Sequence, residues 1–301
     1  MKKLRTLVTI ALFFTIIFTS YVYAKNTKIG DVDEEEKWAV IICGGIKNDT
    51  RGLDNLQRNI TKRVYEIFKQ FGYDDEHIYF LQLRNSSGDE QDLPVEVDAF
   101  SNKSNAKYAI ANWLANNSDE NDACSIFLID HGNFDFATGG AYFSLYDSLH
   151  DKKESIRSVE LAEWLENISY NTCTIYIDAC FSGGFIKHIS GEKRIIMTST
   201  KLTPGVASKT GDFSSFFLDK LEENVSYGEA WEYAGKKHLK IKIRDMPEEA
   251  PLEVKIKARI FILIQSPQID DNGDKRGSGR RFIADKLPIR RDGFLALNTY
   301  P

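Results

Sequence analysis

Short apolar runs alternate with amphipathic stretches along most of this chain, and that alternation limits the folds it can adopt. Strands that are apolar on both faces are typical of parallel sheets covered by helices. The expected strands are residues 38–45, 77–83, 123–132, 173–180 and 193–200. The expected helices, which repeat apolar side chains at helical spacing, are residues 53–72, 106–117, 158–168, 213–223 and 226–239.

This order of elements predicts a single α/β domain, residues 37–274, with a doubly wound, mostly parallel sheet and helices on both faces. Residues 140–147 (GAYFSLYD) interrupt the alternation, and we expect an antiparallel excursion there. Residues 84–104 are polar and rich in turn formers, which indicates a surface loop. Residues 253–265 (EVKIKARIFILIQ) fit a strand or a helix, and residues 275–301 are expected to form a charged tail.

The first 24 residues have the parts of a secretory signal peptide. A basic start (MKKLR) precedes an apolar run, which ends in Val22-Tyr23-Ala24, a sequence typical of a cleavage site. The run is shorter than the ~20 residues of a comfortable membrane span. We therefore expect a removed signal and a secreted or periplasmic protein, with an uncleaved anchor as the alternative. Residues 25–36 would then be a polar lead-in to the domain.

The charge of the exported part disfavours one class of partner. The first 24 residues hold 3 of the 39 basic residues and none of the 44 acidic ones, so the remainder has 36 basic and 44 acidic residues, a net charge of −8. Binding nucleic acid requires clustered basic groups. We expect no nucleic-acid partner and no stable membrane span after signal removal, while the oligomeric state stays open.

The chain has four cysteines, and each lies in or beside an apolar, strand-like run. Cysteines buried in strands are usually inert small hydrophobic residues. We expect Cys43, Cys124 and Cys173 to be core thiols, with a disulfide among them as the alternative. Cys180 differs, because it stands where a strand breaks into a glycine-containing turn.

His131 and Cys180 end two of the expected strands and are 49 positions apart. In open parallel sheets, functional groups gather at the carboxyl ends of the strands. If the two strands are neighbours, about 5 Å apart, the imidazole could take the thiol proton or stabilise the thiolate. Singly, each residue is more often a loop histidine or a core cysteine. Together, they indicate a thiol nucleophile and its base.

Glycines flank both residues. Gly132 has no side chain to block a substrate, and its N–H together with that of Cys180 could bind a developing oxyanion. Gly183 and Gly184 are expected to let the chain turn sharply after the nucleophile.

Residues 127–132 (FLIDHG) and 176–184 (YIDACFSGG) resemble the His-Gly and Ala-Cys motifs of the caspase-like (clan CD) cysteine peptidases. Further segments are similar to those of the legumain-like, C13-type members of this group: residues 158–165 (SVELAEWL), 211–221 (GDFSSFFLDKL) and 265–274 (QSPQIDDNGD). The resemblance extends from Trp38 to Asp274 and implies a caspase-like fold.

The resemblance implies an exported cysteine endopeptidase that hydrolyses proteins or peptides through an acyl-thioester, without a cofactor. Cys180 would be the nucleophile, His131 the general base or ion-pair partner, and Gly132 an oxyanion donor. This group requires no aspartate as a third member, and none is assigned. Two alternatives stay open: a transpeptidase or ligase that resolves the acyl-enzyme with an amine, and a catalytically inactive binding module.

Substrate specificity departs from the legumain pattern. Legumain has a glutamate two positions before the cysteine, where this chain has Asp178, an acid that would suit a basic P1 side chain. Aligning the early helix places Leu56 where legumain has an arginine that recognises asparagine, with Arg51 and Arg58 nearby but displaced. Asp178 is therefore a candidate substrate-binding residue, and the P1 preference stays open between basic and Asn or Asp.

Residues 270–274 (DDNGD) have oxygen-bearing side chains at alternate positions, as calcium loops do. The glycine and glutamate that a complete EF-hand requires further along are absent, and a tight polar turn is the expected structure. The five histidines are scattered, so we expect no zinc site.

Overall fold

The computed structural model describes residues 35–46, 53–83, 96–147, 150–204, 213–244, 266–279, 292 and 294–301. Nearly all of them belong to one compact unit, Glu36–Pro301. The expected signal peptide and the undecided residues 253–265 lie outside the described residues. Within the described ranges, no helix is both long enough and apolar enough to cross a membrane.

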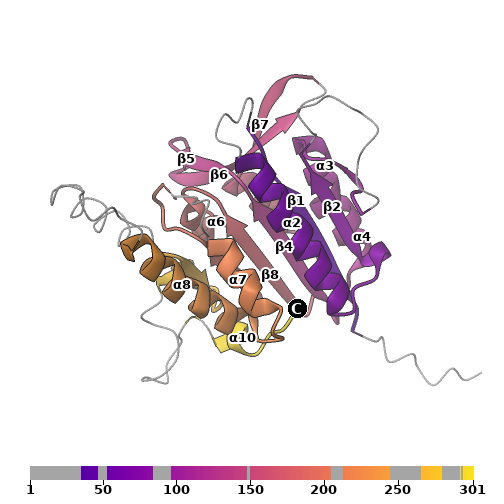
Figure 1. The fold of residues 1–301 in the computed structure, drawn as a ribbon. Helices are drawn as coiled ribbons and strands as arrows, with labels where there is room; N and C mark the ends of the chain where they lie inside the picture. The colour runs from indigo at the N-terminus through magenta and orange to yellow at the C-terminus, as the bar shows by residue number, and fades with distance from the viewer. Residues whose placement is uncertain are drawn as a thin grey trace, which may run out of the picture. The chain divides into compact units, whose positions relative to one another are not determined.

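The main sheet has eight strands in the order β11-β10-β9-β8-β4-β1-β2-β3 (Figure 1). Six are parallel: β1 Lys37–Cys43, β2 Ile78–Gln82, β3 Ala99–Phe100, β4 Ala123–Ile129, β8 Thr172–Asp178 and β9 Arg194–Thr198. Two antiparallel strands complete one edge: β10 Gln268–Asp270 and β11 Ser278–Gly279. The expected mostly parallel sheet is confirmed, and the antiparallel edge was not anticipated.

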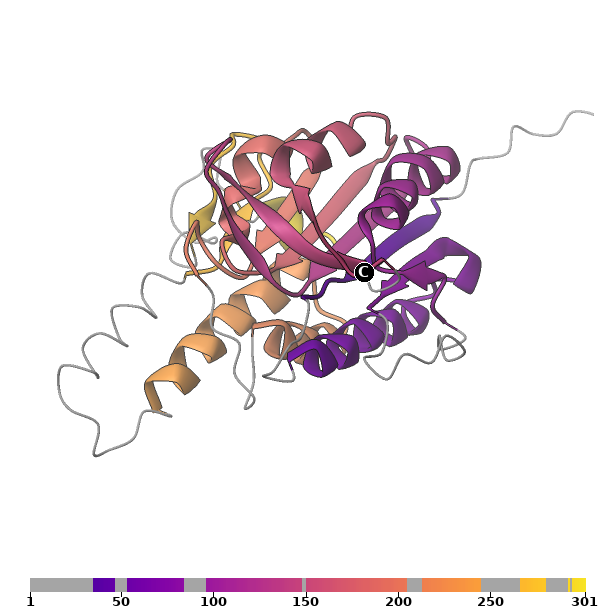
Figure 2. The same ribbon diagram turned by 90° about the horizontal axis from the view of Figure 1, so that it is seen from above.

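Helices cover both faces of this sheet, as Figure 2 shows. One face carries α2 Leu53–Gln70, α7 Phe213–Leu221 and α8 Tyr227–Arg244. The other carries α3 Lys103–Tyr108, the π-helical stretch η2 Ala109–Leu114, α4 Ala115–Asn117, α5 Ser158–Trp164 and α6 Ile186–Ile189. Each layer buries its apolar side chains against the sheet, which yields the predicted doubly wound α/β domain.

A second, three-stranded antiparallel sheet follows β4: β5 Gly132–Asp135, β6 Gly140–Asp147 and β7 Lys152–Arg157. The expected antiparallel excursion is thus β6, and its partners β5 and β7 escaped prediction. Phe143 and Ile156, paired in register, are buried in the same core as α5 and α6. The small sheet therefore belongs to the domain core.

The expectation of a surface loop over residues 84–104 is wrong for its last part. Ala99–Phe100 pairs with β2 as an edge strand, and α3 begins at Lys103. The side chain of Asn102 caps this helix by accepting from Asn105 N at 2.8 Å. Local capping chemistry thus orders a polar stretch that has little apolar periodicity.

The described end of the chain packs on the domain, although a tail was expected from residue 275. A short helix, α10 Phe294–Leu297, contacts α8. Beyond it, the Thr299 carbonyl accepts from Tyr227 N at 2.9 Å, and the Pro301 carbonyl accepts from Lys37 Nζ at 2.8 Å. The last residues therefore connect α8 with the beginning of β1.

Candidate active site

The strands that precede His131 and Cys180 are neighbours. β4 and β8 pair in parallel along their full lengths, with Ile129 opposite Asp178. One further hydrogen bond, from Asp130 N to the Asp178 carbonyl at 3.0 Å, continues the pairing beyond the strands. Both strands end at the same edge of the sheet, as the parallel arrangement requires (Figure 1).

Gly132 lies directly against the backbone of Cys180. A Cβ atom added at Gly132 would lie 2.6 Å from the Cys180 carbonyl oxygen and 2.9 Å from that of Tyr142. No real Cβ contact is this short, so only glycine permits the two segments to meet here. The need for glycine therefore lies in this close approach, and its role as an oxyanion donor stays a prediction.

Both backbone groups of His131, its N–H and its carbonyl, form hydrogen bonds. Its N–H donates to Asp130 Oδ1 at 2.7 Å, and its carbonyl accepts from Ser144 N at 2.8 Å. The same Asp130 oxygen lies 3.4 Å from His131 Nε2, and the Asp130 side chain is fully buried. A buried carboxylate at this distance attracts an imidazolium more strongly than it would in water. The sequence analysis assigned no carboxylate to His131, so Asp130 is an addition from the structure.

The turn after Cys180 contains a left-handed residue that is not glycine. Phe181 has φ 61° and donates its N–H to the Thr203 carbonyl at 2.8 Å. A bulky residue in this region is strained and persists only where its surroundings hold it, as at many functional sites. The chain then enters a 3₁₀ turn, Ser182–Gly184.

The expectation that Gly183 and Gly184 provide the sharp turn is corrected, because neither has a positive φ. Each instead makes a close contact with the loop that follows β9. A Cβ atom at Gly183 would lie 2.8 Å from the Lys201 backbone, and one at Gly184 would lie 2.5 Å from the Leu202 side chain. The glycines bring the Cys180 turn against residues 200–202.

Two buried hydroxyl groups fix this contact. Ser182 N donates to Thr200 Oγ1 at 3.1 Å, and Thr200 N donates to Ser182 Oγ at 3.2 Å. Thr200 Oγ1 also lies 3.2 Å from the Ala179 carbonyl, the residue before Cys180. Both side chains are almost fully buried. Thr200 and Ser182 are thus positioning residues that the sequence analysis missed.

Asp178 is half-buried at the end of β8. Its carboxylate accepts a hydrogen bond from the Ser214 hydroxyl on α7, and Ser214 lies 2.7 Å from the Tyr176 hydroxyl. The side chain is therefore oriented by α7, on the face of the sheet that α2 and α8 also cover. Its role in substrate binding stays a prediction.

The three residues considered for recognition of asparagine, Leu56, Arg51 and Arg58, do not form one group in the described structure. Leu56 packs against the core beneath α2. Burial raises the pKa of Cys43 well above its usual range, and Arg58 is close enough to oppose this shift. Arg58 therefore lies near the end of β1, while Arg51 lies outside the described residues.

The three cysteines expected in the core are buried thiols, as predicted. Cys124 and Cys173 are register partners on β4 and β8, yet they form no disulfide. Burial raises the pKa of Cys124 to about 12 and that of Cys173 further. Cys180 differs from all three because its side chain is partly exposed. Reactivity at neutral pH is therefore expected at Cys180 alone.

Aromatic side chains lie beside the Cys180 turn. Phe134 on β5 packs against Phe136, with ring centroids 4.7 Å apart, and against Phe181 at 6.3 Å. Phe136 is 89% exposed, which is unusual for a phenylalanine. We refer to Phe134, Phe136 and Phe181 as the aromatic rim. It gives the site an apolar surface that the sequence analysis did not predict.

A cavity of about 390 Å³ lies over β6 and β7. Its lining includes Gly45 and Ile46 after β1, Tyr142, Ser144 and Leu145 of β6, and Lys153, Glu154 and Ser155 of β7. Ser144 is the residue that donates to the His131 carbonyl. The apolar rim thus lies beside the Cys180 turn, and the polar cavity is connected to His131 through Ser144.

The model of the Peptidase C13 family matches residues 37–205, more than half of the chain. This match covers β1 to β9 and includes both strand ends of the candidate site. No curated protein matches the chain.

Proposed function

The chain belongs to the peptidase C13 family, which makes it a cysteine peptidase by type, and we propose that it is an exported endopeptidase that uses Cys180 and His131 as a catalytic dyad. The observation that carries the dyad is the pairing of β4 with β8, with Gly132 against the Cys180 backbone. Two side chains suited to nucleophilic catalysis thus leave adjacent strand ends at one edge.

In this mechanism, His131 accepts the proton of the Cys180 thiol, and the thiolate attacks the carbonyl carbon of the scissile peptide bond. The carbonyl oxygen becomes an oxyanion, which the N–H groups of Gly132 and Cys180 would bind. The C–N bond then breaks, and His131 returns the proton to the departing amine. Water, deprotonated by His131, hydrolyses the thioester and regenerates the thiol.

The surroundings support the binding of an extended peptide rather than a small molecule. The aromatic rim offers apolar surface next to Cys180, and the cavity near His131 has room for a polar side chain. Asp178 is proposed as the acid that recognises a basic P1 residue. Export is proposed from residues 1–24 and would place the enzyme outside the cytoplasm.

Labelling with iodoacetamide at neutral pH tests the nucleophile, because the three other thiols are buried. We expect one labelled site, Cys180, and no labelling in Cys180→Ala. The matched control Cys124→Ala, which removes a buried thiol, should be labelled as the wild type is. Labelling spread over several cysteines, or none at Cys180 in folded protein, would remove the basis of the proposal.

A peptide library with every residue at P1 then tests the reaction. Wild type should cleave internal peptide bonds, and Cys180→Ala should not. Adding an amine-terminated acceptor peptide distinguishes hydrolysis from ligation, because a ligated product reports that an amine resolves the thioester. A folded wild type that is labelled at Cys180 but cleaves nothing in the library would contradict the endopeptidase proposal.

A further inference from the structure

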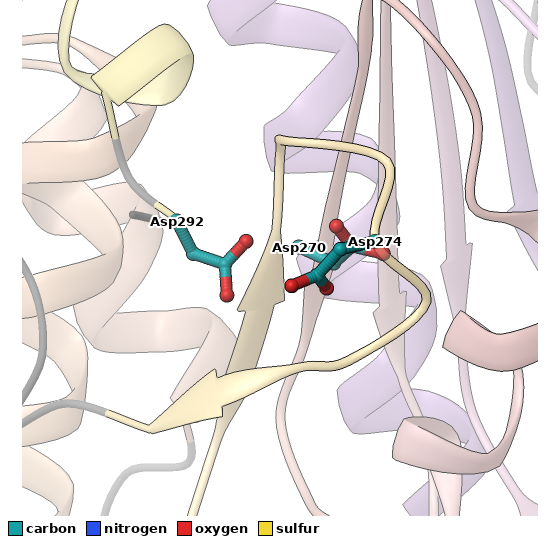
Figure 3. Close-up of side chains that lie close together, drawn as sticks. All are labelled: Asp270, Asp274 and Asp292. Carbon is teal, nitrogen blue, oxygen red and sulfur yellow. The ribbon is translucent and has the colours of Figure 1, made fainter. Parts of the chain in front are cut away.

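Three aspartates gather at the turn that follows β10 (Figure 3). This turn lies against Gly191, just before β9, whereas Cys180 follows the end of β8, so the two are at opposite ends of the parallel strands. Asp270 ends β10, Asp274 lies in the turn that follows, and Asp292 comes from the segment before α10. One carboxylate oxygen from each lies within 4.8 Å of the others. Asp270 and Asp292 are 1% and 4% exposed, whereas Asp274 is exposed. We refer to these three residues as the acidic cluster.

The turn that carries two of them is shaped by its own backbone. Asp270 Oδ1 accepts from Gly273 N at 3.2 Å, and Asp274 Oδ1 accepts from Arg276 N at 2.8 Å. Gly273 has φ 72°, a left-handed conformation that glycine adopts without strain. The turn is anchored to the body where Lys275 N donates to Ser190 Oγ at 3.2 Å.

These contacts use only part of the available oxygens. Asp292 Oδ1 accepts from Asp271 N at 3.3 Å. The Ser190 hydroxyl also lies close to the Asp270 carboxylate. Asp270 Oδ2 itself is fully buried and accepts no hydrogen bond of normal geometry in the described part of the chain. Figure 3 shows the Asp270 and Asp274 side chains together at the β10 turn, with Asp292 facing them from a separate segment. A buried carboxylate oxygen without a partner is costly, and such atoms in native proteins commonly bind water or an ion.

The charges of the acidic cluster also indicate that it needs a positively charged partner. Within the described ranges, no lysine or arginine forms an ion pair with any member of the acidic cluster. The protein thus holds like charges together without a compensating cation of its own.

We propose that the acidic cluster binds a divalent cation, Ca²⁺. Calcium takes six to eight oxygen ligands at about 2.3–2.6 Å, so oxygens on opposite sides of the ion are about 4.6–5.2 Å apart. The spacing within the acidic cluster agrees with this geometry. Backbone carbonyls and water would complete the coordination. Zinc sites are typically built with histidine or cysteine, and the acidic cluster has neither. The expected polar turn is present, held by Asp270, Asn272 and Asp274, and the cation is proposed in addition to these bonds.

The cation would join two parts of the chain that are distant in sequence. Asp270 and Asp274 belong to the β10 turn, while Asp292 leads into α10, whose Ala296 N donates to Asp271 Oδ2 at 3.0 Å. Since the residues after α10 continue to Tyr227 and Lys37, the ion would fasten the C-terminal segment across the domain. Binding should therefore stabilise the folded state.

Melting of the full chain in 1 mM EGTA and in 1 mM CaCl2 tests the site, with calorimetric titration of CaCl2 and MgCl2 as the binding measurement. We expect Ca²⁺ to raise the Tm by about 5 °C or more if its concentration is about 100 times the Kd. An unchanged Tm together with no heat of binding would overturn the proposal. Equal responses to both ions would overturn the assignment to Ca²⁺.

The variants make the test specific to the cluster. Asp270→Asn and Asp292→Asn should abolish the response to Ca²⁺. In EGTA they should melt at or above the wild-type Tm, because removing one charge relieves repulsion. Asp271→Asn is the matched control. The Asp271 carboxylate is adjacent in sequence to that of Asp270, but it accepts from Ala296 N and does not belong to the acidic cluster. It should lower the Tm in both buffers and keep the Ca²⁺ response. Cluster variants that melt below wild type in EGTA would contradict the proposal.

Discussion

Buried polar groups are satisfied in different ways at the two ends of the parallel strands, which we call the two edges of the main sheet. At the Cys180 edge, the turn is held by Ser182 and Thr200, whose hydroxyl and backbone groups bond to one another. At the opposite end of the strands, the buried oxygen Asp270 Oδ2 lies among like charges and has no hydrogen-bond partner among the described residues. Protein groups alone position the first site, whereas the proposal assigns an added cation to the second.

The difference also concerns how each edge is connected. The Cys180 turn is fixed by residues 18 to 21 positions away, across neighbouring strands of one sheet. The acidic cluster joins the β10 turn to the C-terminal segment, and Asp292 comes from 18 positions beyond Asp274. Changes at the first edge should therefore alter activity, and changes at the second should alter stability.

The largest effect is expected from removing the base. His131→Ala should lower kcat/KM by at least about 10³-fold, because the thiol loses the group that accepts its proton. His150→Ala is the matched control, since His150 is exposed and pairs with Asp147, and its activity should be unchanged. Rates of peptide cleavage measure both. A His131→Ala protein that keeps wild-type activity would show that another group activates Cys180.

Asp130→Asn should come next in size. It keeps the shape of the side chain but removes the charge 3.4 Å from His131 Nε2. The imidazolium formed during the reaction loses this attraction, so kcat should fall roughly 10- to 100-fold. KM should change little, because Asp130 is buried and touches no substrate. A rise in KM at constant kcat would instead assign Asp130 to substrate binding.

Thr200→Val should lower both activity and stability. The change leaves buried backbone groups around the Cys180 turn without a partner, which costs about 1–3 kcal/mol. Displacement of the turn should reduce kcat roughly 10-fold. Thr61→Val is the control, because the buried Thr61 hydroxyl bonds to the backbone of its own helix and to the Cys43 thiol, neither of which belongs to the Cys180 turn. Its activity should stay near wild type, and equal losses in both variants would refute a local role for Thr200.

The fold was largely predictable because its strands are continuous apolar runs. β1, β4 and β8 are buried on both faces, and this pattern has no good alternative to a covered parallel sheet. The strands β3, β10 and β11 are two or three residues long, so they have too little periodicity to be recognised. Their pairing depends on tertiary contacts.

The site was predictable only in its principal residues. His131 and Cys180 stand at strand ends, a position that sequence can indicate. Asp130 could not be assigned to His131, because adjacent residues in a strand point to opposite faces and the contact arises only where the chain leaves β4. Thr200 carries no motif. Asp292 lies 18 residues beyond Asp274, so the acidic cluster was visible in sequence only as a polar turn.

A smaller effect tests Asp178. If its carboxylate recognises a basic P1 side chain, Asp178→Asn should reduce kcat/KM for such substrates roughly 5-fold relative to substrates with neutral P1 residues. The ratio is the informative quantity, because the bond from Ser214 gives Asp178 a structural role as well. Ser214→Ala provides the comparison: it removes that bond and should leave the P1 ratio unchanged. A uniform loss across all P1 residues in Asp178→Asn would favour a purely structural role.

The smallest effect is expected when the cation is removed from the acidic cluster and the activity of the Cys180 site is measured. Strand β9 has five residues, so the acidic cluster and the Cys180 turn are separated by roughly 16 Å of sheet. Replacing Ca²⁺ by EGTA should therefore change kcat/KM by less than about twofold well below the Tm, although it lowers the Tm. Peptide cleavage at 25 °C in both buffers measures this. A large loss of activity in EGTA, while the protein is still folded by circular dichroism, would show that the two edges are coupled and that the cation controls catalysis as well as stability.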